Sequence, residues 1–301
     1  MMDMIREDVG LIDMTTVGLG IGSYKAKISF STKEPIVLCG VEFVDEMCRK
    51  LGLETHIFKV CGDKLEAGEL ILEAYGRADA AHKAWKVSQN ILEFLSGIAT
   101  KTHTMITLAR TMNPKIELLT TRKIFPRTKE LALKAVYAGG GAHHRLGLYD
   151  SVLVFKQHRA FFENDAAFEV QFAKMKQMYL EKKIVVEVDS LDEARYFACL
   201  GADIVQCEKM SFEALKQCVA LKNEFPYLLL SATGGIGEHN IVDYFEQIEQ
   251  LLDNDCFEEH HQWYYLLYRN NEFVNCLHNE IELLENFDLQ QEYLIDKNID
   301  C

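Results

Sequence analysis

The 301-residue sequence contains no apolar run that approaches the ~18 residues of a membrane-spanning helix. Its start, MMDMIREDVG, is acidic and lacks the basic-then-apolar order of a secretion signal. Paired cysteine motifs are also missing, because the nine cysteines include no CxxC spacing. An odd number of scattered cysteines suits a reducing compartment better than a disulfide framework. We therefore expect a cytoplasmic protein with core thiols and no membrane contact.

Positive charge is scarce, and glycine and proline are absent from one whole region. The net charge of −14 argues against a nucleic-acid partner. Most of the excess lies between Phe245 and Cys301, where 14 acidic residues face two basic ones. All 18 glycines and all four prolines precede that segment. The composition therefore changes near residue 244, and the body of the chain is almost neutral.

The region 1–104 reads as an N-terminal α/β sandwich domain. Alternating segments broken by turn residues predict an antiparallel sheet at residues 25–31, 36–43, 56–63 and 70–76. Helical spacing occupies residues 44–53 and, at greater length, residues 80–110. Gly97 interrupts the longer pattern, so two helices or one kinked helix would both fit.

From Pro114 onward strands alternate with helices. Apolar strand patterns occupy residues 115–121, 151–155, 183–189, 202–208 and 227–232. Helical patterns fill the gaps at residues 128–137, 160–180, 190–200 and 211–224. Continuous Val, Ile and Leu runs flanked by helices indicate a parallel sheet, and ligands gather at the carboxyl ends of such strands.

Polar residues and glycines follow most of these strands and suggest one binding site. A cationic set could hold phosphates or carboxylates: Thr121, Arg122, Lys123, Lys86, His144 and Arg145, with glycines 139–141. Glu187 and Glu208 form an acidic set suited to Mg²⁺ or to sugar hydroxyls. A sugar diphosphate with Mg²⁺ would need both sets in one pocket.

Several motifs in order resemble one known family. They are EDVGLIDMTT, LSGIAT, LTTRKIFP, GGGAHHRLGLYD, VVEVDSLDEA and TGGI, spread over residues 5–244. The sequence is similar to the quinolinate phosphoribosyltransferases, or carboxylating nicotinate-nucleotide pyrophosphorylases. The resemblance implies an N-terminal α/β sandwich followed by an incomplete α/β barrel at residues 105–244. It also implies a homodimer with shared active sites, and a reaction of phosphoribosyl pyrophosphate (PRPP), Mg²⁺ and quinolinate.

Position by position, the resemblance assigns roles to the site residues. Arg122, Lys123, His144 and Arg145 would bind the acid substrate and PRPP, while Glu187 and Glu208 would face ribose or Mg²⁺. The remaining substrate-binding positions would be Lys86, Thr121, Phe155, Gly234 and Gly235. The implied chemistry is electrostatic, with stabilisation of departing pyrophosphate and of an oxocarbenium-like ribose, and needs no protein nucleophile.

The departures from the family pattern concern substrate choice. Thr120 replaces an Asp, His143 an Asn, Lys86 an Arg and Glu208 an Asp. Phe155 stands where quinolinate enzymes carry a lysine that contacts a substrate carboxylate. Lys156 would not replace it, because adjacent strand residues point to opposite faces. We therefore expect a small aromatic or carboxylate acceptor that lacks the second carboxylate or presents it differently.

These departures look most like the ModD branch of the family, which is associated with molybdate transport. A competing interpretation is a catalytically impaired member that binds a ligand or partner, favoured by Phe155, Glu208 and the altered end of the chain. In the acidic segment 245–301, partial helical spacing predicts two or three amphipathic helices in place of the last barrel strand. That segment would be either a partner-binding extension or a frame-altered end.

Overall fold

The computed structural model describes residues 2–112, 114–243, 264–268 and 277–283. The chain divides into two compact units, Met1–Thr100 with Glu272–Cys301 and Lys101–Asn271. Helix α4 (Ala78–Met112) runs from one unit into the other as one continuous 35-residue helix. Of the two alternatives at Gly97, two separate helices is therefore wrong, and a single helix is present. Among the described helices, none is long and apolar enough to cross a membrane.

The first unit is built around a four-stranded sheet in the order β13-β1-β5-β3. Strands β1 (Lys25–Thr32), β3 (Glu54–Ile57) and β5 (Leu70–Arg77) pair antiparallel, as their alternating patterns predict. Alternate residues of β1, such as Ile28 and Phe30, are fully buried. The shorter elements are α1 (Met2–Val9), α2 (Met14–Gly18), β2 (Ile36–Val37), α3 (Val41–Lys50) and β4 (Lys64–Leu65).

The segment 36–43 is only partly a strand. Its first two residues pair with β4, and helix α3 already begins at Val41. Gly40 stands between them with φ of 99°, a left-handed conformation that favours glycine. A Cβ at this position would lie 2.8 Å from Leu95 Cδ1 on α4, so the turn also needs the missing side chain.

The second unit contains a seven-stranded parallel sheet in the order β7-β6-β12-β11-β10-β9-β8. All five strands predicted in this region are present, as β6 (Glu117–Thr120), β8 (Val152–Val154), β9 (Ile184–Val188), β10 (Ile204–Glu208) and β11 (Leu229–Thr233). The connecting helices are α5 (Lys129–Ala138), α6 (Lys156–Arg159), α7 (Asp165–Met178), α8 (Leu191–Cys199) and α9 (Phe212–Ala220). The short strand β7 (Ala142–His143) was not predicted.

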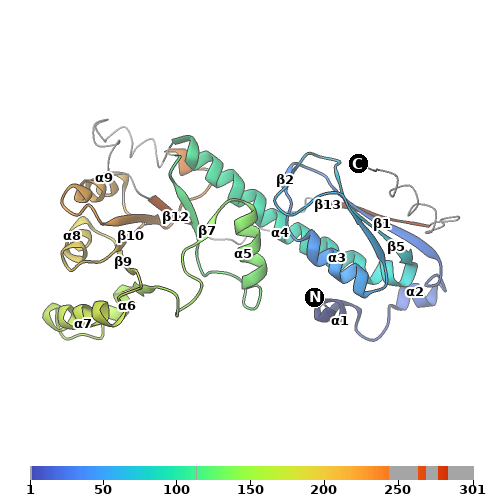
Figure 1. The fold of residues 1–301 in the computed structure, drawn as a ribbon, viewed down its shortest axis with the longest axis horizontal. Coiled ribbons are helices and arrows are strands. Elements are labelled where there is room, and N and C mark those ends of the chain that lie inside the picture. Colours follow the sequence, from blue (N-terminus) through green and yellow to red (C-terminus); the bar gives the residue numbers. More distant parts are fainter. Residues whose placement is uncertain (1, 113, 244–263, 269–276, 284–301) are drawn as a thin grey trace, which may run out of the picture. The chain divides into compact units, whose positions relative to one another are not determined.

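The two faces of this sheet differ in chemistry. Helices α7, α8 and α9 lie along one face (Figure 1), and Val186, Val205 and Leu230 point into the apolar core beneath them. Their neighbours in sequence point to the other face because side chains alternate along a strand. That opposite face carries Glu187, Gln206, Glu208, Ser231 and Thr233. The face of the sheet that packs against the helices is therefore apolar, and the opposite face is polar.

The helices predicted for the acidic segment are wrong wherever the structure describes it. Residues Tyr264–Tyr268 form β12, which pairs in parallel between β11 and β6. Residues Leu277–Leu283 form β13, which pairs antiparallel with β1 of the first unit. The sheet thus gains the strand that was expected to be missing, and the chain returns to the N-terminal sheet. The third predicted helix, at residues 248–252, lies outside the described residues.

Both errors have a physical reason. YYLLY is an aromatic and apolar run of five residues, and short runs of this kind fit a buried strand as well as a helix. In LHNEIEL the apolar or uncharged residues occur at every second position, which is strand periodicity. The acidic residues Glu280 and Glu282 would also fit the polar face of an amphipathic helix, so this strand was assigned to a helix.

Candidate functional site

The carboxyl ends of the parallel strands surround a cavity of about 700 Å³. Most of the residues predicted for the site line it. The lining residues are Thr121, Arg122, Lys123, His144, Arg145, Leu148, Leu153, Phe155, Gln157, His158, Glu187, Gln206, Glu208 and Thr233. They come from β8, β9, β10 and β11, from helix α6, and from the loops that follow β6, β7 and β8. The cavity therefore lies where a parallel sheet normally binds its ligands.

Three cations form one side of the cavity. Arg122 and Lys123 follow β6 and are exposed, and the turn is held by the Lys123 N–H, which donates to Thr121 Oγ1 at 3.2 Å. Arg145 is only 8% exposed and donates to the Ser151 carbonyl at 3.5 Å. Burial, and secondly the charge of Arg122, lowers the pKa of Arg145. A buried guanidinium next to a second one favours an anion between them.

His144 is uncharged at neutral pH. Burial, and secondly the charge of Arg145, lowers its pKa from 6.5 to about 4. Its backbone N–H donates to the Thr120 carbonyl at 3.2 Å, which fixes the residue at the end of β6. The imidazole therefore serves the cavity as a hydrogen-bonding group rather than as a cation.

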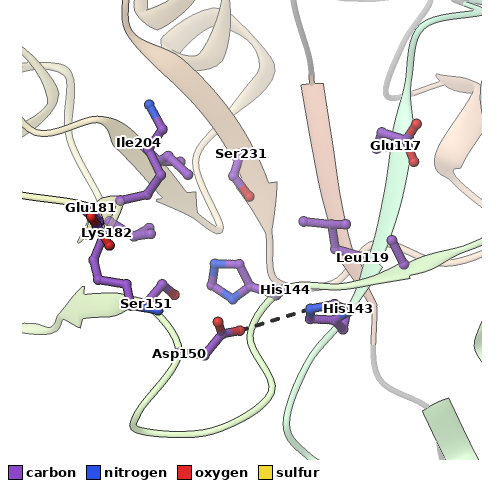
Figure 2. Close-up of a pocket in the computed structure, with 13 residues that line it drawn as sticks. Glu117, Leu119, His143, His144, Asp150, Ser151, Glu181, Lys182, Ile204 and Ser231 are labelled. Carbon is purple, nitrogen blue, oxygen red and sulfur yellow. Dashed lines mark ion pairs between the residues drawn. The ribbon is translucent and has the colours of Figure 1, made fainter.

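His144 also lines a second cavity of about 540 Å³ toward the amino-terminal ends of the strands. In Figure 2 the His144 ring and the Ser231 side chain both extend into this space. His144 Nε2, Ser151 Oγ and Ser231 Oγ are buried and have no hydrogen-bond partner within the described part of the chain. His143 lies nearby, with Nε2 4.0 Å from Asp150 Oδ2. The two cavities thus share the imidazole of His144.

Acidic and amide groups form another side of the main cavity. Gln206 Nε2 donates to Glu187 Oε2 at 2.8 Å, and the two residues are register partners on β10 and β9. Burial, and secondly the charge of Glu208, raises the pKa of Glu187. Gln206 is 4% exposed, and its Oε1 has no partner among the described residues. A ligand hydroxyl that donates to this oxygen would satisfy it.

The same side fits a hard divalent cation. A positive ion would offset the effect of the Glu208 charge on the Glu187 carboxylate, and oxygen ligands suit Mg²⁺. Among the described residues, no group of three or more His, Cys, Asp or Glu side chains could hold a metal ion alone. An ion at Glu187 and Glu208 would therefore take its other ligands from water and substrate, as Mg²⁺ commonly does.

The loop after β11 has a backbone conformation that would let a ligand approach the main chain closely. Gly234 and Gly235 have φ of 89° and 82°. A Cβ on Gly234 would lie 2.9 Å from Glu208 Oε1 and 2.5 Å from Lys209 Cγ, so a side chain is excluded there. The two glycines do not themselves line the cavity in the described structure, although Thr233 directly before them does.

Phe155 lies at the cavity, but the strand ends earlier than predicted. Strand β8 stops at Val154, and Phe155 is the residue before helix α6. The alternation argument for Lys156 therefore rests on a strand that does not continue. Its conclusion still holds on different grounds, because the Lys156 ammonium is bound to Asp189 and Lys156 is not among the lining residues.

Lys86, like Gly234 and Gly235, is a predicted site residue that does not line this cavity. It is exposed on the part of α4 that belongs to the first unit, and its Nζ donates to Gln89 Oε1 at 2.5 Å. Sequence reasoning in turn missed Gln206 and Gln157 and did not assign His158 to the ligand site. Gln206 could have been found, because it lies two residues before Glu208 on the same strand and therefore on the same face of the sheet.

Fold and site together define an α/β protein with a cavity lined by cations and carboxylates at the carboxyl ends of its parallel strands. The chain matches the family models "Quinolinate phosphoribosyl transferase, N-terminal domain" over residues 13–96 and "Quinolinate phosphoribosyl transferase, C-terminal domain" over residues 98–252. The chain therefore belongs to the quinolinate phosphoribosyltransferase family, whose members are pentosyltransferases.

Relatives and solved structures agree with this assignment. A Pasteurella multocida protein named "Putative pyrophosphorylase ModD" is 36% identical over 253 residues, covering 83% of this chain and 89% of the relative. A Methanocaldococcus jannaschii protein named "Probable nicotinate-nucleotide pyrophosphorylase [carboxylating]" is 33% identical over 245 residues, covering 80% and 85%. The nicotinate-nucleotide pyrophosphorylase structure from Francisella tularensis shares the fold, with a TM-score of 0.78, 24% identity and coverage of 93% and 94%.

Proposed function

We propose that this protein transfers the phosphoribosyl group of PRPP to the ring nitrogen of a small aromatic acid and releases pyrophosphate. One observation carries the proposal: a single cavity combines the cations Arg122, Lys123 and Arg145 with the carboxylates Glu187 and Glu208. A sugar diphosphate presents anionic phosphates at one end and hydroxyls at the other. The cationic side of the cavity suits the phosphates, and the side with the carboxylates suits the hydroxyls.

The residues act by binding and by charge. Arg122, Lys123 and Arg145 hold the acceptor carboxylate and the phosphates, and the backbone at Gly234 and Gly235 admits a phosphate closely. The C1–O bond of ribose breaks and its electron pair leaves with pyrophosphate, while the acceptor nitrogen forms the new bond to C1. Glu187 stabilises the positive charge that develops on the ribose. No covalent protein intermediate is needed.

We assign Glu187 and Glu208 as the residues that would hold Mg²⁺. The ion would supply charge neutralisation for the pyrophosphate group. Gln206 orients the Glu187 carboxylate through its hydrogen bond, so it acts as a positioning residue for the same site.

We also propose a homodimer in which Lys86 completes the active site of the neighbouring subunit. Lys86 is exposed and cationic, and in its own chain it belongs to the other compact unit. The exposed apolar side chains of Leu11, Met14 and Leu19 in the N-terminal unit offer surface for a subunit contact. The expected enzyme is therefore active only as an assembled pair.

Because the chain is similar to proteins named "Putative pyrophosphorylase ModD", we place it in that branch. We further propose that its reaction is linked to molybdenum metabolism, which predicts that transcription of the gene responds to molybdate supply. We place the reaction in the cytoplasm, because the cysteines described by the structure are all free thiols, as expected in a reducing compartment.

The deciding experiment measures pyrophosphate release from PRPP with a panel of aromatic acids, with Mg²⁺ and with a chelator. We expect Mg²⁺-dependent release with at least one monocarboxylic acid, and loss of release in Arg145→Ala and Glu187→Gln. If no acid in the panel causes pyrophosphate release but one of them binds tightly, the result would favour the alternative of an impaired, ligand-binding family member. The presence of Arg122, Lys123, Arg145, Glu187 and Glu208 in one cavity argues against that alternative.

A further inference from the structure

The wall of the cavity that begins at Phe155 carries no cation. Phe155, Gln157 and His158 line the cavity at this side, whereas Lys156 and Arg159 do not. Lys156 is bound to Asp189. Arg159 donates to Glu193 Oε1 at 2.9 Å and lies over the Phe197 ring at 5.0 Å, in the core beneath the helices. Both basic side chains of α6 are thus held away from the ligand.

The hydrogen bonds of His158 fix what it offers to a ligand. Its ring stacks on Phe155 with 5.6 Å between centroids and 24° between planes. The Phe155 backbone N–H donates to His158 Nδ1 at 2.9 Å. Since Nδ1 accepts a hydrogen bond, the proton of the neutral ring is on Nε2. The wall therefore presents an apolar ring face, an amide from Gln157 and one N–H donor.

We propose that Phe155 and His158 select the acceptor, which is an aromatic monocarboxylic acid with an uncharged hydrogen-bond acceptor, such as a carbonyl, beside its carboxylate. The single carboxylate binds the arginine side of the cavity, and the neighbouring neutral group accepts from His158 Nε2. A second carboxylate at that position would lie unpaired against Phe155, which is costly in a partly buried site. This inference rests on the proposed function, because it names the acceptor class of that reaction.

Binding of unreactive analogues tests the wall without any transfer reaction. The probes are benzoate, phthalate and phthalamate, which share one ring carboxylate and differ in the group beside it: hydrogen, a carboxylate or a carboxamide. Calorimetry on the full-length protein should show phthalamate binding at least tenfold more tightly than phthalate. Phthalate binding as tightly as phthalamate would overturn the inference, whatever the variants show.

Two variants and one control separate the contributions. Phe155→Lys should reverse the preference and favour phthalate at least tenfold. His158→Phe keeps an aromatic ring on Phe155 but removes the N–H, so it should abolish the preference for phthalamate over benzoate and leave benzoate binding unchanged. Lys156→Ala, outside the cavity, should match the wild type. An unchanged phthalamate preference in His158→Phe would contradict the role of His158.

The same proteins distinguish failure of this inference from failure of the proposed function. If the binding preferences are observed but PRPP yields no pyrophosphate with any acid, the selective role of Phe155 and His158 is supported and the transferase proposal fails. If wild-type protein releases pyrophosphate faster with quinolinate than with every monocarboxylic acid, the transferase proposal stands and the neutral wall is wrong.

Discussion

At the scale of single residues, burial and neighbouring charges set the chemistry of the cavity. His144 and Arg145 are adjacent in sequence, yet one is neutral and the other is a buried cation. Glu187 keeps a proton more readily than a surface glutamate because of burial and Glu208. Each of these shifts predicts a dependence on pH.

His144 should make folding stability depend on pH. Its pKa is lowered to about 4 in the folded protein, so the unfolded chain takes up this proton first as pH falls from 6.5. Stability should therefore decrease between these values, by an amount on the order of 3 kcal/mol from this group. Urea unfolding over that pH range measures the effect. His144→Gln should flatten the profile, and a variant profile equal to that of the wild type would refute the assignment.

Glu187 should determine the acidic side of the activity profile. Its pKa is raised, so the ionised form is lost at a higher pH than for an ordinary glutamate. Glu208→Gln removes a negative charge beside it, lowers the pKa of Glu187 and should move the acidic limb of kcat/KM to lower pH. Pyrophosphate release over a pH series measures the limb independently of amplitude. Exposed Glu213→Gln is the control, and an unmoved limb in Glu208→Gln would contradict the coupling.

At the scale of elements, the turn of three glycines before β7 packs so closely against neighbouring elements that it leaves no space for a side chain at Gly141. The segment of three glycines leads into β7, which brings His143 and His144 beside β6. At Gly141 a Cβ would lie 2.7 Å from Thr102 Cγ2 on α4 and 3.2 Å from the Leu118 carbonyl. The glycine is needed here for space, because its φ lies outside the left-handed region.

Gly141→Ala should therefore displace β7 and destabilise the protein by about 1–3 kcal/mol, as overpacking does. Thermal unfolding measures the loss. Gly18→Ala is the matched control, because nothing lies within 4 Å of a Cβ at that position. Removing the methyl group of Thr102 in a Thr102→Ser, Gly141→Ala double variant should restore part of the stability. No recovery would show that the backbone contact dominates.

At the scale of the whole molecule, the chain crosses between its two units and then returns. Strand β12 completes the parallel sheet between β11 and β6, and β13 closes the open edge of β1. Edge strands with unpaired backbone groups promote aggregation. The late return of the chain therefore matters for solubility as well as for the site.

A chain that ends after residue 276 should expose the β1 edge. Hydrogen exchange of the β1 amides should accelerate, and the protein should aggregate as its concentration rises. A chain that ends after residue 283 keeps both strands and serves as the control. Equal protection of β1 in the two truncated proteins would argue against the β1–β13 pairing.

The proposed shared active site predicts complementation between subunits. Lys86→Ala and Glu187→Gln should each abolish activity in a homodimer. Mixed dimers would contain one site with both defects and one with neither, so mixing the two inactive proteins should restore about a quarter of the activity. Activity that stays absent after verified subunit exchange would place Lys86 outside the neighbour's site.

The sequence by itself determined the parallel sheet, its five early strands and the residues at their carboxyl ends, because continuous apolar strands and the polar residues that end them are local patterns. It also indicated that Phe155 replaces a cation. Only the tertiary structure decided that Gln206 is hydrogen-bonded to Glu187, that Lys156 and Arg159 are bound elsewhere, and that His158 stacks on Phe155. It also decided that β12 and β13 are strands. Pairing with β1, β6 and β11 satisfies their backbone hydrogen-bonding groups, and these long-range partners do not appear in the local sequence pattern. Local periodicity specifies an element, but long-range hydrogen bonds and charges select its partner.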